Sequence, residues 1–242
     1  MTMVSHKYKF IFIKPGKVAG SSVLQALGKQ AGPEDIVVST RDTEGLERHE
    51  QNNLMPGLNY FRDSTYPGGI IPAPSMDTIL KEHMVPHEIK EIIGEEVWNT
   101  YCKITIVRNP WDRLVSSYCW NEGDGVDATL FEPDLENPRF RSRFWYTVAT
   151  AAGINEKYYF MKNHQPVADF YMRYESLNKD YQHICKQLGI PIEELPTLKK
   201  RDTKFKNPYW EYYDAHLRQF VREKCDRTIE YFGYKFENDK SY

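Results

Sequence analysis

The chain has 242 residues, of which 40% are hydrophobic and 27% are charged, the balance of a soluble globular protein. Its formal net charge of -2 lacks the basic excess that general binding to nucleic acid or anionic membranes requires, so we expect neither partner. No segment approaches the roughly 20 apolar residues of a membrane span, and the first residues contain no apolar signal-peptide core. Together with four widely spaced cysteines, these features predict a cytoplasmic location, unless the sequence is an excised lumenal domain.

The first half of the chain predicts strands that alternate with helices. The apolar run YKFIFI favours a strand, Lys14-Pro15-Gly16 ends it, and the next apolar positions recur at helical spacing. A long polar stretch follows, and loops of that length in compact domains often carry function. The expected elements are a strand at 8–13, a helix at 22–29, a strand at 36–38, a loop at 40–75, a helix at 86–101 broken near Gly94, and a strand at 102–107.

The second half continues this alternation. Tyr213, Leu217, Phe220, Val221 and Ile229 share one face at helical spacing, which predicts a helix with a core-facing stripe. The expected elements are helices at 111–120, 139–152, 177–188 and 211–232, a strand at 169–174, an acidic loop at 121–138 and a basic stretch at 199–206. The alternation indicates an α/β fold, a parallel β-sheet flanked by helices, in one domain over residues 1–242.

A glycine-containing turn joins the first strand to the first helix. It reads Lys17-Val18-Ala19-Gly20-Ser21-Ser22, and a strand, turn and helix in this order direct backbone N–H groups and a positive helix end at an anion. Ser21 and Ser22 offer hydroxyls, and Lys17 offers a point charge. A nucleotide triphosphatase loop has its lysine directly after the last glycine, which this turn does not. When the segment is taken alone, an ordinary turn with an N-capping serine is the favoured explanation.

A second motif follows the strand at 102–107. Arg108 closes this apolar strand, and in open α/β sheets the ligand crevice lies at that edge. Ser116 lies eight residues later, after a turn that contains Pro110. A guanidinium and a hydroxyl at this spacing suit one phosphate group. For Arg113 a structural ion-pair role is favoured.

The two motifs together resemble those of the PAPS-dependent sulfotransferases, where PAPS is 3′-phosphoadenosine-5′-phosphosulfate, and especially the carbohydrate sulfotransferase branch. That family has a loop K-x-A-G-[ST]-S and an element V-R-[ND]-P-x-x-R-x-x-S, and every fixed position of both is present here, at 17–22 and 107–116. The segments 170–177, 195–196 and 212–214 also look like family patterns. The usual approach to the loop is I-P-K, whereas this chain has Ile13-Lys14-Pro15-Gly16-Lys17.

The resemblance implies a fold like that of P-loop NTPases, with PAPS as sulfuryl donor, PAP as product and no metal. It places the 5′-phosphosulfate on Lys17, Val18, Ala19, Gly20, Ser21 and Ser22, and the 3′-phosphate on Arg108 and Ser116. Lys200 and Arg201, from the basic stretch, are expected to close over the nucleotide. Lys17 is the expected lysine at the leaving oxygen, with Lys14 as the alternative.

The acceptor hydroxyl needs a general base, and histidine has an unperturbed pKa of about 6.5 that suits this role. His83 stands before the Arg108 strand at a place that resembles the position of the family's catalytic histidine. His87, four residues later, is the alternative base. We therefore expect His83 and Lys17 to be the catalytic residues.

Two other functions remain open at this point. A P-loop kinase or NTPase would need a lysine beside the last glycine and a Mg²⁺-binding aspartate after a strand, and neither is found. A non-catalytic nucleotide-binding module would be favoured by the loss of Lys17 or of the base. The acceptor, a glycan or small molecule bearing a hydroxyl, depends on loops expected at 40–75 and 121–165. The sequence predicts no oligomeric state.

Overall fold

Within the described residues, the sheet contains three neighbouring parallel strands and one strand that is antiparallel to both of its neighbours. The computed structural model describes residues 2–32, 34–37, 84–122, 136–196 and 207–237. These residues form two compact units, Met1–Val107 with Tyr158–Leu198, and Arg108–Lys157 with Lys199–Tyr242. We call them unit 1 and unit 2 and describe each by itself.

Unit 1 contains the whole sheet. Its elements are β1 (Thr2–Ser5), β2 (Phe10–Ile13), α1 (Gly20–Gly28), β3 (Ile36–Val37), α3 (Pro86–Thr100), β4 (Cys102–Val107), β5 (Phe170–Arg173), the 3₁₀ helix η4 (Tyr174–Ser176) and α7 (Leu177–Leu188). The strand order is β3-β1-β2-β4-β5. β2, β4 and β5 are parallel, whereas β1 is antiparallel to both β2 and β3. The expected α/β fold is confirmed, and the antiparallel β1, which the sequence analysis missed, makes the sheet mixed.

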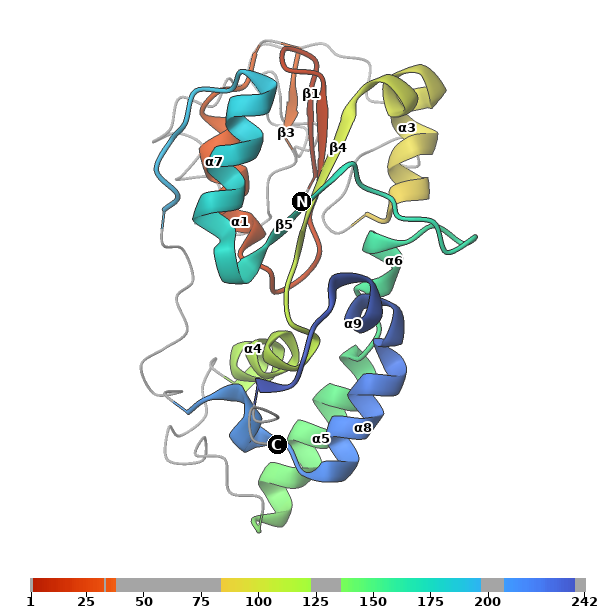
Figure 1. The fold of residues 1–242 in the computed structure, drawn as a ribbon, viewed down its shortest axis with the longest axis vertical. Helices are drawn as coiled ribbons and strands as arrows, with labels where there is room; N and C mark the ends of the chain where they lie inside the picture. Colours follow the sequence, from red (N-terminus) through yellow and green to blue (C-terminus); the bar gives the residue numbers. More distant parts are fainter. Residues whose placement is uncertain (1, 33, 38–83, 123–135, 197–206, 238–242) are drawn as a thin grey trace, which may run out of the picture. The chain divides into compact units, whose positions relative to one another are not determined.

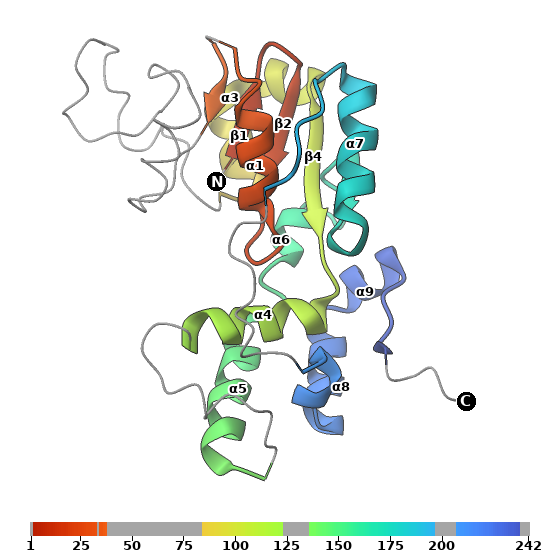
Figure 2. The same ribbon diagram turned by 90° about the vertical axis from the view of Figure 1, so that its left-hand side faces the viewer.

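Helices cover both faces of this sheet. α1 and α7 lie on one face and α3 on the other (Figure 1 and Figure 2). Successive residues of a strand point to opposite faces, so Phe10 and Phe12 of β2 enter the core beneath α1 and α7, together with Ile104 and Ile106 of β4. All four side chains are fully buried. β2 is therefore apolar throughout and β4 ends in a buried run, Ile104 to Val107, as expected of a sheet that is covered on both faces.

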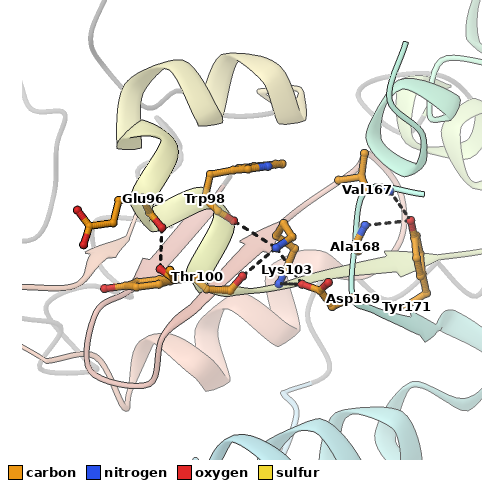
Figure 3. A network of polar contacts seen from close by, with 9 residues as sticks. Glu96, Trp98, Thr100, Lys103, Val167, Ala168, Asp169 and Tyr171 are labelled. Carbon is orange, nitrogen blue, oxygen red and sulfur yellow. Dashed lines mark hydrogen bonds and ion pairs between the residues drawn. The ribbon is translucent and has the colours of Figure 1, made fainter. Parts of the chain in front are cut away.

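A polar network fixes the amino ends of β4 and β5 (Figure 3). The Nζ of Lys103 donates to the carbonyl oxygens of Trp98 (3.2 Å) and Tyr101 (2.9 Å), and it lies 3.0 Å from Oδ2 of Asp169. The same Oδ2 accepts the Lys103 N–H at 2.8 Å. The Tyr171 hydroxyl accepts two backbone N–H groups and donates to the Tyr159 carbonyl. This network links the carboxyl end of α3 to β4, and it fixes the register between β4 and β5.

Unit 2 is helical and has an aromatic core. Its elements are α4 (Pro110–Glu122), α5 (Pro138–Ala151), η5 (Tyr209–Tyr212), α8 (Ala215–Lys224) and α9 (Asp226–Phe232), and α6 (Glu156–Tyr159) begins in it and ends in unit 1. α5 and α8 pack side by side (Figure 1). Phe144 stacks on Phe140 and meets Tyr118 and Tyr213 edge to face, with ring centroids 5.1–5.8 Å apart. Such pairs add to the stabilisation from burying large rings.

The expectation of one helix over 211–232 is wrong. The segment forms η5, α8 and α9, because two residues interrupt it. Asp214 has an extended backbone, and its carboxylate accepts the Leu217 N–H at 2.8 Å, which starts α8. Cys225 has φ -122° and ψ 25° and separates α8 from α9. The apolar stripe itself faces the core as expected, since Leu217 and Val221 are buried.

The break near Gly94 is confirmed, because this glycine interrupts α3 with φ 84° and ψ 162°. Within the described parts of the chain, no helix has the length and apolar character needed to cross a membrane.

A buried carboxylate in unit 2 makes its stability depend on pH. Glu156 is only 8% exposed, and its Oε1 accepts hydrogen bonds from the backbone N–H (3.1 Å) and the hydroxyl of Thr228, in the first turn of α9. Arg227 Nε lies 3.5 Å from its Oε2. Burial nevertheless raises the pKa of Glu156 above its ordinary value of 4.5, against the opposing effects of Thr228 and Arg227.

We predict that Glu156→Gln removes this pH dependence. A raised pKa means that Glu156 contributes fully to the free energy of unfolding below pH 4.5, and that this contribution is lost as the pH rises through the folded-state pKa. The unfolding free energy of the wild type minus that of Glu156→Gln should therefore fall as the pH rises above 4.5, measured by urea denaturation. Glu223→Gln, an exposed carboxylate of α8, is the control. A difference that rises with pH would contradict the prediction.

Candidate functional site

The loop between β2 and α1 has the backbone geometry of an anion site. Lys17 and Ala19 have left-handed φ values of 64° and 60°. When left-handed and right-handed backbone conformations alternate, successive N–H groups point into one concavity, and such a concavity favours the binding of anions. Ala19 is the N-cap residue of α1, and its methyl group cannot accept a hydrogen bond from the first turn. An anion is therefore a suitable partner for the N–H groups at this helix end.

Two lysines belong to this loop. Lys17, the expected lysine, is half-buried at its left-handed position. Lys14 is only 7% exposed, and its Nζ donates to Oγ of Ser21 at 3.1 Å. The side chain of Lys14 crosses Gly20 so closely that a Cβ there would lie 2.3 Å from its Cγ. The loop thus places an ammonium and a hydroxyl together at the start of α1.

A cavity of about 440 Å³ opens beside the same helix end. Ser22 of α1 contributes to it, and its other walls come from residues 174–179, which follow β5 and which we call the cavity segment, and from residues 195–196. The lining residues are Ser22, Tyr174, Glu175, Ser176, Leu177, Asn178, Lys179, Leu195 and Pro196. Its volume is in the range of small-ligand pockets, so unit 1 combines an anion loop with space for an organic group.

The sheet explains why these features lie at one edge. β2, β4 and β5 are parallel neighbours, with Ile13 opposite Thr105 and Val107 opposite Arg173. Their carboxyl ends share one edge, which is where open α/β sheets bind ligands. The loop of residues 14–19, which we call the anion loop, follows β2, and the cavity segment follows β5. Arg108, the first residue of unit 2, directly follows β4.

In unit 2, Arg108 is buried and held by an acidic neighbour. Only 7% of Arg108 is exposed, and its Nε donates to Oδ2 of Asp112 at 2.7 Å. Asn109 caps α4, because its Oδ1 accepts the N–H groups of Trp111 (3.1 Å) and Asp112 (3.4 Å). The Asn-Pro pair therefore starts the helix, and Asp112 fixes the orientation of the guanidinium. This partner was not predicted from the sequence, although a carboxylate four residues after Arg108 is one turn away on a helix.

Ser116 and Arg113 both lie on α4 but differ in surroundings. Ser116 is half-buried, two turns into the helix. Arg113 is 5% exposed and donates to the Ala151 carbonyl at 2.6 Å. Burial raises the pKa of the nearby Cys225 thiol to about 11, and the charge of Arg113 opposes this rise. Arg113 thus contacts a backbone carbonyl in the interior of unit 2, and the ion-pair role that the sequence favoured stays a prediction.

The remaining expected residues lie outside the described residues. These are His83, Lys200, Arg201 and the whole 40–75 loop. Within the described chain, the alternative base His87 is exposed in the first turn of α3. The structure thus places Lys17 to Ser22 together in unit 1 and Arg108 and Ser116 in unit 2. The roles given to these residues stay predictions.

Comparison with known proteins identifies the family. A family model described as "Sulfotransferase family" matches residues 1–241. An Archaeoglobus fulgidus protein, described as an uncharacterized protein, is 23% identical over 105 residues, which cover 43% of this chain and 82% of that protein. No solved structure matches the chain. Because the family model spans nearly the full sequence, the chain belongs to the sulfotransferase family.

Proposed function

We propose that the protein transfers a sulfuryl group from PAPS to an acceptor hydroxyl and releases PAP. Membership of the family supports sulfuryl transfer in general; the donor, the acceptor and the base are parts of our proposal. The observation that carries it is the loop after β2, where left-handed residues, a buried ammonium and serine hydroxyls surround an uncapped helix start. This arrangement suits the 5′-phosphosulfate end of the donor.

The other parts of the donor have matching residues. The cavity beside Ser22 suits the nucleoside, since it adjoins the anion loop within unit 1. Arg108 and Ser116 are assigned the 3′-phosphate, which distinguishes PAPS from adenosine phosphosulfate. A planar guanidinium oriented by Asp112 is well suited to bidentate phosphate binding. Lys200 and Arg201 are proposed to close over the nucleotide.

The proposed reaction is an in-line displacement at sulfur. The acceptor oxygen forms a bond to sulfur as the bond between sulfur and the bridging oxygen breaks, and that oxygen leaves with the electron pair on PAP. His83 takes the acceptor's proton, and Lys17 stabilises the negative charge on the bridging oxygen. Positioning and charge stabilisation carry most of the catalysis, as in phosphoryl transfer.

A test of donor choice separates this function from its two alternatives. We predict that PAP raises the melting temperature of the protein and that Mg²⁺-ATP at the same concentration does not, because the loop has no lysine after Gly20. PAPS should then be consumed with at least one member of a panel of phenols, alcohols and glycans. Stabilisation by Mg²⁺-ATP alone would support a kinase or NTPase. Binding of PAP without turnover on any acceptor would support a non-catalytic module.

For the base, we predict that His83→Ala lowers kcat roughly 100- to 10,000-fold, the usual contribution of general base catalysis. The affinity for PAP should stay within about twofold, because the histidine acts on the acceptor and not on the nucleotide. His87→Ala is the matched control, since His87 is four residues away and exposed. Near-normal turnover of His83→Ala, with loss of turnover in His87→Ala, would assign the base to His87.

For the 3′-phosphate, we predict that Arg108→Ala weakens PAP binding about tenfold or more, the cost of losing a hydrogen bond to a charged group. The affinity for AMP, which has no 3′-phosphate, should not change. Both constants are measured by isothermal titration calorimetry. Arg141→Ala serves as control, because Arg141 is an exposed arginine of unit 2 that lies 3.5 Å from Asp214. Equal weakening of PAP and AMP by Arg108→Ala would remove Arg108 from 3′-phosphate recognition.

A further inference from the structure

We infer that Lys14 is a second donor-binding cation of the loop and that Gly20 is required because the Lys14 side chain crosses it. This inference rests on the proposed function and extends it to a residue outside the K-x-A-G-[ST]-S run. Lys14 is the first residue after β2, so the strand fixes its backbone at the carboxyl edge of the sheet. Its side chain then reaches the start of α1.

The position of the ammonium supports a binding role. Lys14 is more than nine-tenths buried, yet its Nζ lies 3.1 Å from Oγ of Ser21, in the first turn of α1. A buried ammonium gains most free energy from a neighbouring anion. Ser21 accepts a hydrogen bond from Lys14, which leaves the hydroxyl hydrogen of Ser21 to donate. An anionic oxygen at this helix end would therefore meet a charge, a hydroxyl donor and backbone N–H groups.

Gly20 determines whether the Lys14 side chain can take this path. A Cβ on residue 20 would lie 2.3 Å from Cγ, 2.8 Å from Cδ and 2.9 Å from Cε of Lys14. These separations are far below van der Waals contact, so any larger residue must displace the lysine side chain. Displacement would move Nζ away from Ser21 while leaving the strand and helix in place. The path of the Lys14 side chain therefore depends on glycine at position 20.

The first test separates the charge of Lys14 from its packing. Lys14→Met keeps a long apolar side chain over Gly20 but removes the ammonium. We expect PAP to bind about tenfold more weakly, as for loss of a charged hydrogen bond, while the melting temperature of the unliganded protein is not lowered. Lys29→Met, at the other end of α1 and exposed, should bind PAP as the wild type does.

The second test is a double-mutant cycle on PAP affinity with Lys14→Ala, Gly20→Ala and the combined variant. If Gly20→Ala acts by displacing Lys14, it should weaken PAP binding about tenfold in the wild type and less than about twofold when Lys14 is already alanine. Equal effects in both backgrounds, or wild-type affinity in Lys14→Met, would overturn the inference while PAP binding by the wild type still supports the proposed function. A wild type that does not bind PAP would overturn both.

Discussion

The parallel pairing of β2, β4 and β5 is the constraint on which the candidate site depends. Parallel strands end at the same edge, and within unit 1 two of them lead into parts of the candidate site: the anion loop follows Ile13, and the residues that line the cavity follow Arg173. Lys103 and Asp169 hold the opposite ends of β4 and β5 in register. A one-residue slip would turn each strand's side chains to the other face, so this register also decides which side chains reach the edge.

Buried charges in both units are matched to polar groups that define their orientation. Arg108 is held by Asp112, Arg113 by the carbonyl of Ala151, and Lys14 by Ser21. Such contacts offset part of the free energy needed to bury a charge, and they order the side chain before any ligand arrives. A phosphate or phosphosulfate that binds groups already in place avoids the entropy of ordering them.

Much of the fold could be predicted from the sequence where local and tertiary preferences agree. The strand at 102–107 and the helix at 177–188 were predicted with their observed limits, because an apolar run and a helix closed by Gly189 are strong local signals. β1 was missed because Thr2 and Ser5 make a weak local pattern, and the strand is stabilised by its pairing with β2 and β3. The prediction of one helix over 211–232 was wrong because the apolar periodicity of this segment outweighed the capping signal of Asp214. The path of Lys14 over Gly20 depends on the three-dimensional turn, and sequence spacing alone does not reveal it.

The hairpin of β1 and β2 has a consequence for how the protein folds. Its turn brings Ser5 opposite Phe10, so this pair can form from neighbouring residues, whereas Phe10 must find Cys102 across a long intervening chain. Distant pairings close large loops and are the slow step in proteins of high contact order. The chain can therefore assemble the hairpin early, while the edge on which the candidate site is built becomes complete only when β4 and β5 have joined it.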